Sequence, residues 1–426
     1  MTILTVQEAL AEIVAHVERL PAVPVALDEA LGLVLAHDVV SDVDSPPFDK
    51  ALMDGYAVRA GDLASGRATL RVIDEVLAGQ VPWRPVGSGE ATRIMTGAPI
   101  PEGADAVVQV EHTRPAITGS DAAVAIETTT VAAGRNIMKR GESLHKGTCV
   151  LPAGRQIRPQ EIGALAELGH DPLAVYARPR VAVLSTGDEL VPVGEVPGPG
   201  KIRNSNAAML TAQLRHMGAE AVSLGVARDD PSSLRERIER GLAFDALVLS
   251  GGVSAGKLDL VPAVLAEAGV QRIFHKVQVK PGQPIWFGVF RRPPREESGP
   301  GPAPAAASAE LHSKSCYVFG LPGNPVSSMV CCELFARTAI RRLMGVEPAL
   351  PTPRRARLAS DHFSRGNRPT YHPARFEWTE SGAAVELVRW MGSADLSATV
   401  EANAMALFPE GERMYAAGAV VEVFLW

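Results

Sequence analysis

The chain has 426 residues, of which 46% are hydrophobic and 21% charged, and this length and composition are typical of a folded protein with more than one domain. Its net charge is -6 and it contains no basic block, which argues against a protein that binds nucleic acid in bulk. No apolar run approaches the roughly 18 to 20 residues that cross a bilayer, and the N-terminus lacks the cationic start of a signal peptide. We therefore expect a cytoplasmic protein without a membrane segment.

The cysteines and histidines do not form a recognisable metal or disulfide pattern. The four cysteines are Cys149, Cys316, Cys331 and Cys332, with no Cys-x-x-Cys pair, and the ten histidines show no His-Glu-x-x-His spacing. We expect all four cysteines to be small buried apolar side chains in a reducing compartment, and we expect no zinc site.

The first part of the chain predicts an arm interrupted by a β domain. Residues 5–20 carry apolar side chains at helical spacing, which predicts an amphipathic helix. Short alternating runs separated by Gly and Pro then predict a small inserted β domain at residues 43–141. We assign residues 1–42 and 142–178 to an elongated helical and β arm, with a short helix at 158–168 that begins with a proline.

Residues 179–344 alternate strand and helix signals, which predicts a doubly wound, mostly parallel sheet with ligands beyond the carboxyl ends of its strands. Within this domain, residues 291–314 are rich in Pro, Gly, Ala and Ser and predict a disordered hairpin tip. Residues 345–426 return to short strands and predict a small C-terminal domain resembling a β-barrel. The fold class is therefore multidomain α/β plus β. The expected α/β strands are 181–184, 221–226, 246–249, 272–279 and 317–320, and the expected helices are 205–217, 231–242, 260–268 and 326–344.

The stretch 245–259, DALVLSGGVSAGKLD, is the most informative part of the sequence. Its apolar run has the length of a strand, and Ser250, Gly251 and Gly252 then allow a tight turn close to a ligand. Asp259 follows where a helix can begin. This order places amide N–H groups and a carboxylate at one edge of the sheet, which suits an anionic ligand held together with a cation.

Carboxylates follow three of the predicted strands: Asp188 with Glu189, Asp229 with Asp230, and Asp259. Any one of them can simply cap a helix. Three at equivalent strand ends repel one another unless a cation lies among them, and Mg²⁺ suits a site that also holds phosphate.

Two lysines and a proline-rich loop complete the residues that could carry chemistry. Lys276 and Lys280 are four apart on a predicted strand, so their side chains should leave the same face and either hold an oxyanion or form a solvated surface. Residues 321–325, LPGNP, open the last helix, where Asn324 offers side-chain hydrogen bonds. Residues 194–201, GEVPGPGK, depart from a Walker loop in spacing and carry two prolines, and no dinucleotide fingerprint is present.

Several motifs in order resemble the MoeA family of molybdopterin molybdotransferases, which includes the E domain of gephyrin. The resemblance runs from about Pro46 to Ser328, with a weaker match at GSADLS and EANAM near residues 392–405. The motifs are PPFDKALMDGYAV, RIMTGAPIPEGADAVV, GRNIMKRGE, PRVAVLSTGDELV, KIRNSN, ARDDP, SGGVSAGKLD, KVQVKPGQP and GLPGNPVSS.

The resemblance implies an enzyme of molybdenum-cofactor biosynthesis that inserts molybdenum from molybdate, its substrate, into adenylylated molybdopterin with Mg²⁺-dependent release of AMP. It also implies an elongated homodimer, with the site between the α/β domain of one subunit and the β domain of the other. The upstream pterin-adenylylating protein is a further partner that the resemblance suggests, whereas nucleic acid and membrane are not expected.

Carried across motif by motif, the resemblance assigns roles to fourteen positions. Asp229 and Asp259 would hold Mg²⁺, the lysines would hold molybdate or phosphate, and the glycine turn would face the phosphate side of the pterin. The catalytic residues implied are Asp54, Glu189, Asp229, Asp259, Lys276 and Lys280. The substrate-binding residues implied are Thr96, Gly251, Gly252, Ser254, Pro322, Asn324, Pro325 and Ser393.

One departure from the family pattern leaves alternatives open. Where the family usually has Gly-Glu-Asp after a basic pair, this chain has Ser143 in place of the aspartate, and Glu142 is the candidate substitute. The alternatives to an insertase are a scaffold or sensor that binds molybdopterin without catalysis, and a protein that only binds or adenylylates the pterin.

Overall fold

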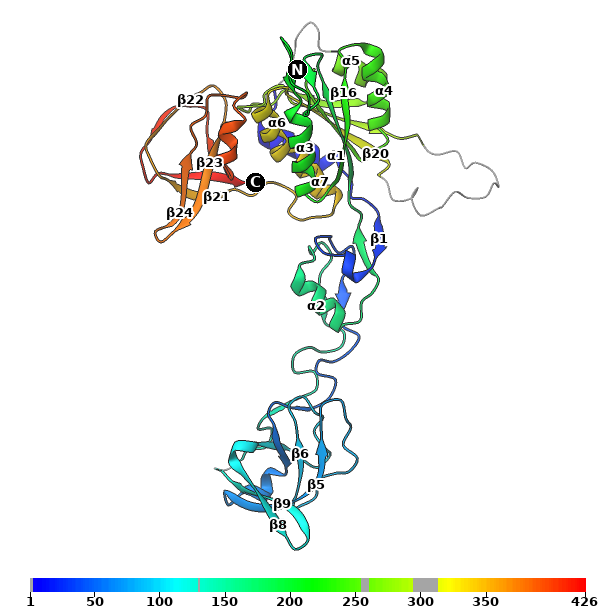
Figure 1. The fold of residues 1–426 in the computed structure, drawn as a ribbon, viewed down its shortest axis with the longest axis vertical. Coiled ribbons are helices and arrows are strands. Elements are labelled where there is room, and N and C mark those ends of the chain that lie inside the picture. The colour runs from blue at the N-terminus through cyan, green and yellow to red at the C-terminus, as the bar shows by residue number, and fades with distance from the viewer. Residues whose placement is uncertain (1–2, 129–130, 254–259, 294–312) are drawn as a thin grey trace, which may run out of the picture. The chain divides into compact units, whose positions relative to one another are not determined.

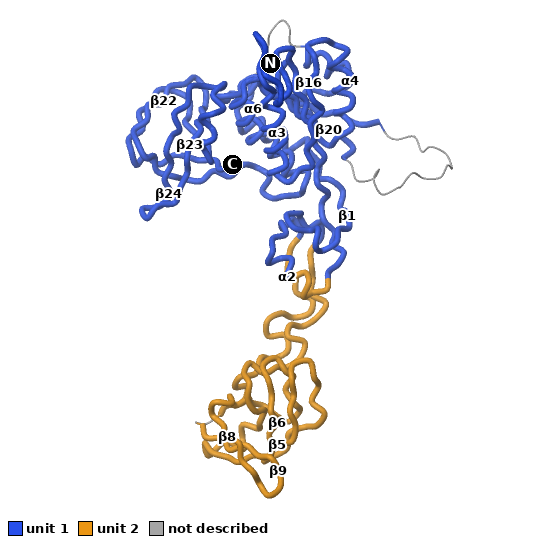
Figure 2. The backbone as a smooth tube through the Cα atoms, viewed as in Figure 1, with its two compact units in different colours: residues 1–37, 153–163, 170–426 blue, residues 38–152, 164–169 orange. Residues whose placement is uncertain are grey.

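The computed structural model describes residues 3–128, 131–253, 260–293 and 313–426. The chain divides into two compact units (Figure 2). Unit 1 contains residues 1–37, 153–163 and 170–426, and unit 2 contains residues 38–152 and 164–169. Ser254, Asp259 and most of the predicted hairpin tip at 291–314 lie outside the described residues.

Unit 1 is built on a mixed six-stranded sheet, of which β16 and β20 are labelled in Figure 1. Its strand order is β16-β13-β17-β20-β19-β18. The first four strands in this order are parallel, and β19 and β18 are antiparallel to their neighbours, so the mostly parallel sheet predicted from sequence is confirmed. The strands are β13 (Arg180–Thr186), β16 (Glu220–Ala227), β17 (Ala246–Ser250), β18 (Gln271–His275), β19 (Trp286–Arg291) and β20 (Ser315–Leu321).

Helices cover both faces of this sheet, which explains why its central strands are apolar over most of their length. Leu210 and Val330 belong to the core on one face, and Leu234 and Leu265 to the core on the other. The helices concerned are α3 (Ser205–His216), α4 (Pro231–Gly241), α5 (Val261–Glu267), α6 (Pro325–Cys331) and α7 (Arg337–Leu343).

The prediction of a strand over residues 272–279 is wrong at its C-terminal end. β18 ends at His275, and Lys276 has a positive φ of 74°. Because His275 pairs with Trp286 in the antiparallel β19, the residues between them form the connection and not a strand. Val277 and Val279 are fully buried in this connection, and their alternation is what imitated a strand.

Two helices also differ from their predictions. α1 (Val6–His16) begins with the capping box formed by Thr5 and Glu8, but it ends earlier than the predicted residue 20. The predicted helix 326–344 is interrupted by a π-helical turn at Cys332–Ala336, which separates α6 from α7. The predicted helix at 158–168 is confirmed as α2 (Pro159–Glu167).

The rest of unit 1 contains short strand pairs and a C-terminal barrel. β1 (Ala22–Val25) pairs with β12 (Leu173–Tyr176), and β14 (Leu190–Val191) pairs with β15 (Ile202–Arg203). The C-terminal strands form a closed barrel of order β21-β24-β23-β25-β27, as the sequence predicted. They are β21 (Arg354–Leu358), β23 (Thr370–Thr379), β24 (Gly382–Leu387), β25 (Ala404–Phe408) and β27 (Val420–Leu425), beside the pair β22 (His362–Gly366) and β26 (Gly411–Tyr415).

Unit 2 is a β domain around a six-stranded sheet of order β7-β4-β6-β5-β9-β8, in which only β5 and β6 run parallel among the described pairs. Cys149 on β11 is exposed, so the prediction that all four cysteines are buried is wrong for this one. The sheet strands are β4 (Gly55–Val58), β5 (Arg67–Val76), β6 (Glu90–Ile94), β7 (Ala106–Gln109), β8 (Thr113–Thr118) and β9 (Asp121–Glu127). The short pairs are β2 (Val39–Val40) with β11 (Cys149–Leu151), and β3 (Lys50–Ala51) with β10 (Ile137–Met138).

Among the described residues, every helix is too short or too polar to cross a bilayer.

Candidate functional site

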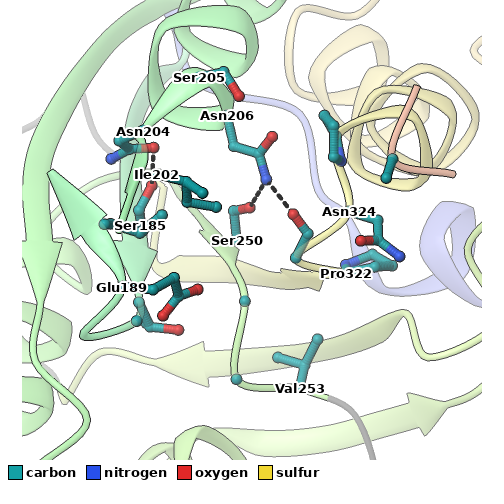
Figure 3. A pocket seen from close by; sticks show the side chains of 18 of the residues that line it. Ser185, Glu189, Ile202, Asn204, Ser205, Asn206, Ser250, Val253, Pro322 and Asn324 are labelled. Carbon is teal, nitrogen blue, oxygen red and sulfur yellow. Dashed lines mark hydrogen bonds between the residues drawn. The ribbon is translucent and has the colours of Figure 1, made fainter. Parts of the chain in front are cut away.

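A cavity of about 720 Å³ lies at the carboxyl ends of β13, β16, β17 and β20 (Figure 3). This is where ligands bind in open α/β sheets, because the loops that follow parallel strands converge at that edge. The lining comes from the residues after each strand, from Ile202 to Asn206, and from Ala394 and Leu396 of the segment that precedes β25.

The structure brings seven of the residues predicted from sequence into the wall of this cavity. An eighth, Ser393, lies directly behind Asn324, since the Asn324 Nδ2 donates to the Ser393 Oγ at 2.9 Å and the Val326 N–H donates to the Ser393 carbonyl at 3.0 Å. The seven are Glu189, Asp229, Gly251, Gly252, Pro322, Asn324 and Pro325.

Lys276 and Lys280 are not among the described residues that line the cavity. They lie in the connection between β18 and β19, whose Pro284 does line it. The backbone of Lys280 is held by the barrel: its N–H donates to the Pro369 carbonyl at 2.9 Å, and its carbonyl accepts from the Tyr371 N–H at 2.7 Å. The lysine connection is therefore fixed to the C-terminal domain.

Asn206 is a functional candidate that the sequence reasoning missed. Its Nδ2 donates to the Ser250 Oγ and to the Gly323 carbonyl, both at 2.7 Å, which ties the end of β17 to the loop after β20 (Figure 3). Two residues earlier, the Asn204 Oδ1 caps α3 and accepts from the Ser185 Oγ at 3.1 Å. The signal for Asn206 in the sequence is its place in the family motif KIRNSN.

Two polar atoms in the cavity wall are buried without a hydrogen-bond partner among the described residues: the Asn206 Oδ1 and the Thr186 Oγ1. Buried polar atoms in native proteins are nearly always satisfied, by protein, by water or by a ligand. Both atoms are buried, so a polar ligand in the cavity would pair with them only after a rotation of the side chain.

The glycine turn after β17 brings the backbone close to the neighbouring strand. Gly251 and Gly252 have φ values of 98° and 65°, where L-residues with side chains are strained. A Cβ added to Gly251 would lie 2.7 Å from the Thr186 carbonyl oxygen. The turn therefore depends on glycine both for its conformation and for its close approach to β13.

The two neighbouring aspartates after β16 have different tasks. The Asp230 Oδ1 caps α4 by accepting from the N–H groups of Ser232 at 3.1 Å and Ser233 at 2.9 Å. The Ser232 hydroxyl, followed by the Ser233 amide, lowers the pKa of Asp230. Asp229 instead lines the cavity, and it exchanges long hydrogen bonds of 3.3 and 3.4 Å with Asp188 on the loop after β13.

Basic side chains hold the outer loop of the cavity. The Lys201 Nζ donates to the Asp188 carbonyl at 2.6 Å. The Arg203 Nε donates to the carbonyls of Val193 at 3.1 Å and Glu195 at 3.0 Å. The stretch that only superficially resembled a Walker loop is thus the connection between β14 and β15, held against the cavity rim by its own basic residues.

Two carboxylates that line the cavity are the described candidates for holding a magnesium ion together with a substrate. No group of three or more His, Cys, Asp and Glu side chains comes together in the described parts of the chain. The cavity does offer the carboxylates of Glu189 and Asp229. Mg²⁺ commonly binds one or two carboxylates and takes its remaining oxygen ligands from substrate phosphates and water.

In unit 2, the structure brings together the two predicted residues Asp54 and Thr96. The Thr96 N–H and the Thr96 hydroxyl both donate to the Asp54 Oδ1 at 2.7 Å. These two hydrogen bonds, the amide first, lower the pKa of Asp54 because they favour its charged form. Asp54 is therefore an ionised carboxylate with a fixed orientation.

We expect Thr96→Ala to raise the pKa of Asp54 toward its ordinary value, because the hydroxyl donor is lost while the backbone donor remains. The titration of the Asp54 carboxyl carbon, followed by NMR, measures this change. Thr96→Ser keeps a hydroxyl and should leave the pKa low. An Asp54 pKa that is the same in Thr96→Ala and wild type would show that the hydroxyl does not bind this carboxylate.

The family pattern has an aspartate at the position of Ser143. In this chain other carboxylates, those of Glu142, Asp49 and Asp44, bind the turn around Ser143. The Glu142 Oε2 accepts from the Lys139 N–H at 2.7 Å, so this carboxylate serves its own turn. The basic pair before it is matched by two other aspartates: Lys139 binds Asp49 and Arg140 binds Asp44, each at 2.7 Å. The pKa of Asp44 is lowered by hydrogen bonds from the Lys146 amide and from Arg140. The pKa of Asp49 is lowered first by its hydrogen bond from Lys139.

Comparison with known proteins covers the chain almost from end to end. Residues 4–169 match the MoeA N-terminal region (domain I and II), residues 182–342 a probable molybdopterin binding domain, and residues 355–426 the MoeA C-terminal region (domain IV). The chain is 34% identical to a molybdopterin molybdenumtransferase of Staphylococcus aureus, over 99% of this chain and 95% of that protein. It is 33% identical to one of Staphylococcus epidermidis, over 100% of this chain and 96% of that protein.

The fold agrees with a solved structure of the same family. The molybdopterin biosynthesis MoeA protein of Pyrococcus horikoshii superposes with a TM-score of 0.80 at 30% identity, covering 100% of this chain and 99% of that one. Apart from Ala394 and Leu396, the residues that line the cavity lie in the part that matches the molybdopterin binding domain. The chain therefore belongs to the MoeA family of molybdopterin molybdenumtransferases, and it is a transferase of molybdenum-cofactor biosynthesis.

Proposed function

We propose that this transferase inserts molybdenum from molybdate into adenylylated molybdopterin and releases AMP. The observation that carries the proposal is the cavity at the strand ends, where a glycine turn and the carboxylates of Glu189 and Asp229 meet. Amide groups and acidic side chains at one edge suit a substrate that contains a phosphate-to-phosphate bridge together with a cation. The names of the Staphylococcus relatives support the same transfer.

In this reaction a water molecule adds to the phosphorus on the pterin side, the bridging P–O bond breaks, and AMP leaves with the oxygen of the bridge. The two dithiolene sulfurs of the pterin, entering as thiols, bind molybdenum, and their two protons leave with one oxo group of molybdate as water. The glycine turn at Gly251 and Gly252 would present backbone N–H groups to the phosphates. After a rotation of either side chain, the unpartnered Asn206 Oδ1 or Thr186 Oγ1, both buried in the protein alone, would bind a polar group of the substrate and fix its orientation. Asn206 would also keep the two phosphate-facing loops together through Ser250 and Gly323.

Asp229 would hold Mg²⁺, together with Asp259, which lies outside the described residues. When bound, the ion would offset phosphate charge and lower the barrier to attack on phosphorus. Glu189, which lines the cavity, would orient the attacking water or the ion. Lys276 and Lys280 would hold molybdate or a phosphate oxygen through their ammonium groups.

The proposal also includes a homodimer. Asp54 and Thr96 belong to unit 2, and we propose that they complete the site of a partner subunit, with the Asp54 carboxylate kept ionised by Thr96. Ser254 would join the phosphate side, and Pro322, Asn324, Pro325 and Ser393 would shape the substrate side. A reducing, cytoplasmic setting is part of the proposal, since all four cysteines are free.

The test is a single-turnover measurement of AMP release from adenylylated molybdopterin by the purified full chain, with Mg²⁺ and with or without molybdate. Molybdate-dependent AMP release, with molybdenum retained on the pterin product, is the expected result. Binding of adenylylated molybdopterin without AMP release would favour a non-catalytic scaffold or sensor. Formation of adenylylated product from molybdopterin and ATP would favour the adenylylating alternative.

Removal of magnesium should abolish this activity. We expect chelation of divalent cations to slow AMP release by at least about 100-fold, because the phosphate charge is then no longer offset, and we expect added Mg²⁺ to restore it. The chelated enzyme should still bind the substrate, although more weakly. AMP release at the same rate before and after chelation would remove Mg²⁺ from the proposed reaction.

A further inference from the structure

A second cavity, of about 290 Å³, lies between the helix that contains α7 and the C-terminal barrel. It shares no described lining residue with the cavity at the strand ends. The helix contributes Glu333, Arg337 and Arg341, and the barrel side contributes Arg354, Met405 and Phe424. The cavity therefore combines three guanidinium groups, one carboxylate and an apolar wall.

The carboxylate that lines this cavity, that of Glu333, already interacts with two neighbouring side chains. Glu333 is only 3% exposed, and its Oε1 lies 2.6 Å from the Arg337 Nε while its Oε2 accepts from the Gln213 Nε2 at 2.9 Å. Arg341 donates to the Pro348 carbonyl, at 2.7 Å from Nη2. Within the described parts of the chain, no carboxylate lies at salt-bridge distance from Arg341 or Arg354. The cavity thus retains two guanidinium groups that form no salt bridge within the described residues.

This charge is unfavourable in the protein alone. Arg337 and Arg341 are four residues apart on α7, a spacing at which like charges repel. Arg341 is half-buried, and its pKa is lowered by burial and then by the charge of Arg337, while the charge of Glu347 opposes this shift in part. A bound anion would add negative charge beside the guanidinium group and offset the repulsion from Arg337.

The helix is distorted at the same place. The π-helical turn at Cys332–Ala336 immediately precedes α7 and contains Glu333 and Leu334, two adjacent residues that both reach the cavity. A turn of this kind adds a residue to the helix and occurs often at functional sites. Glu333 in this turn forms an ion pair with Arg337, and Arg341 lies one turn further along the helix.

We propose that this cavity binds a multivalent oxyanion, held by the guanidinium groups of Arg341 and Arg354 with Arg337 behind them. Guanidinium forks match the paired oxygens of phosphate-like anions. The volume is at the small end for ligand pockets, so inorganic oxyanions and small phosphate monoesters fit, and Met405 and Phe424 would pack against any organic part. Because the site joins α7 to the barrel, its occupation stabilises the packing of the barrel against the α/β domain.

The test measures the Tm of the full-length protein in titrations with phosphate, sulfate, molybdate and AMP, at an ionic strength kept constant with potassium chloride. The four titrations separate an inorganic oxyanion from a phosphate monoester as the preferred ligand. Arg354→Gln should weaken the apparent affinity for phosphate by about tenfold or more, as expected for the loss of a charge-assisted hydrogen bond. Arg354 is exposed and its side chain makes no hydrogen bond within the described residues, so this variant should fold normally.

Arg355→Gln is the matched control. Arg355 is the next residue on β21 and its side chain leaves the opposite face of the strand, so the affinity should equal that of wild type. Binding of anions at the proposed catalytic lysines would affect all three proteins alike and leaves this comparison intact. In crystals soaked with tungstate, we expect an anomalous peak between Arg341 and Arg354.

Equal affinities in Arg354→Gln and Arg355→Gln would overturn the proposal, as would a wild-type Tm that responds to phosphate no more than to potassium chloride. A tungstate peak found only in the cavity at the strand ends would overturn it as well. None of these results bears on the proposed molybdenum transfer, because that reaction uses the other cavity.

Discussion

Asp229→Asn should slow AMP release by about 100-fold or more while the protein keeps the Tm of wild type. Asp229 is exposed on the loop after β16 and lines the cavity, and its hydrogen bonds within the described residues are the two long ones with Asp188. An asparagine has the same size and can still accept from the Asp188 N–H, so the loop should persist. What is lost is the negative charge of the carboxylate that we propose as a ligand of the magnesium ion.

Asp230→Asn is the control for this prediction, because it changes the same charge one residue away. Asparagine caps helices as well as aspartate does, so α4, the Tm and AMP release should all stay close to wild type. Asp230→Ala removes the cap and should lower the Tm, again with little effect on turnover. The proposed role of Asp229 would be contradicted if Asp229→Asn released AMP as fast as wild type. It would also be contradicted if Asp230→Asn released AMP as slowly as Asp229→Asn.

The pH dependence of the cap can be predicted from the same geometry. The pKa of Asp230 is lowered in the folded protein, so its stabilising contribution is present above the ordinary aspartate pKa. That contribution is lost as the pH falls through the lowered value. Asp230→Ala should therefore differ from wild type most at neutral pH, and the difference in Tm should shrink in acid.

The central strands could be predicted closely from sequence because burial on both faces leaves a continuous apolar run. The run predicted at 246–249 is β17 (Ala246–Ser250), and the run predicted at 317–320 is β20 (Ser315–Leu321). Since such strands must end at a common edge of a parallel sheet, the position of the cavity followed from the pattern as well. The turn chemistry of Gly251 and Gly252 was readable for the same reason.

The backbone conformation of the connection that contains Lys276 and Lys280 could not be predicted from sequence. An alternating pattern indicates which side chains are buried, and it does not show whether the backbone is extended. Val277 and Val279 alternate with polar residues and are fully buried, which is what an edge strand would show. Their burial is achieved by a connection in which Lys276 takes a left-handed conformation. The placement of Lys280 then depends on Thr370 and its neighbours in the barrel, about ninety residues away along the chain, and no local pattern contains that information.

The different roles of the neighbouring residues Asp229 and Asp230 could be predicted in part from the sequence. Pro231 at the first position of α4 already marks Asp230 as the residue that caps this helix, which leaves Asp229 for the cavity. By contrast, the partners of Asn206 are Ser250 and Gly323, which are 44 and 117 residues away in sequence. A residue whose role is to join two distant loops is recognised only when the strands that carry those loops are in place.

Gly251→Ala should be the most destabilising single-methyl change in the cavity. A φ of 98° strains an alanine by about 1 to 2 kcal/mol. The added Cβ would lie 2.7 Å from the Thr186 carbonyl oxygen and 2.9 Å from its Oγ1, and such overpacking adds about 1 to 3 kcal/mol. The Thr186 carbonyl belongs to the end of β13 and cannot rotate away, so the turn itself must move. We therefore expect a clear fall in Tm together with weaker binding of adenylylated molybdopterin.

Gly382→Ala separates backbone strain from this close approach. Gly382, at the start of β24, has a similar φ of 111°, but an added Cβ there meets no atom within 4 Å. This variant should carry the strain alone, so its Tm should fall less than that of Gly251→Ala and its substrate affinity should stay unchanged. Scanning calorimetry and equilibrium binding on both variants make the comparison. Equal losses of Tm would mean that Gly251 is needed only for its conformation, and the contact between the glycine turn and β13 would then have no part in shaping the cavity.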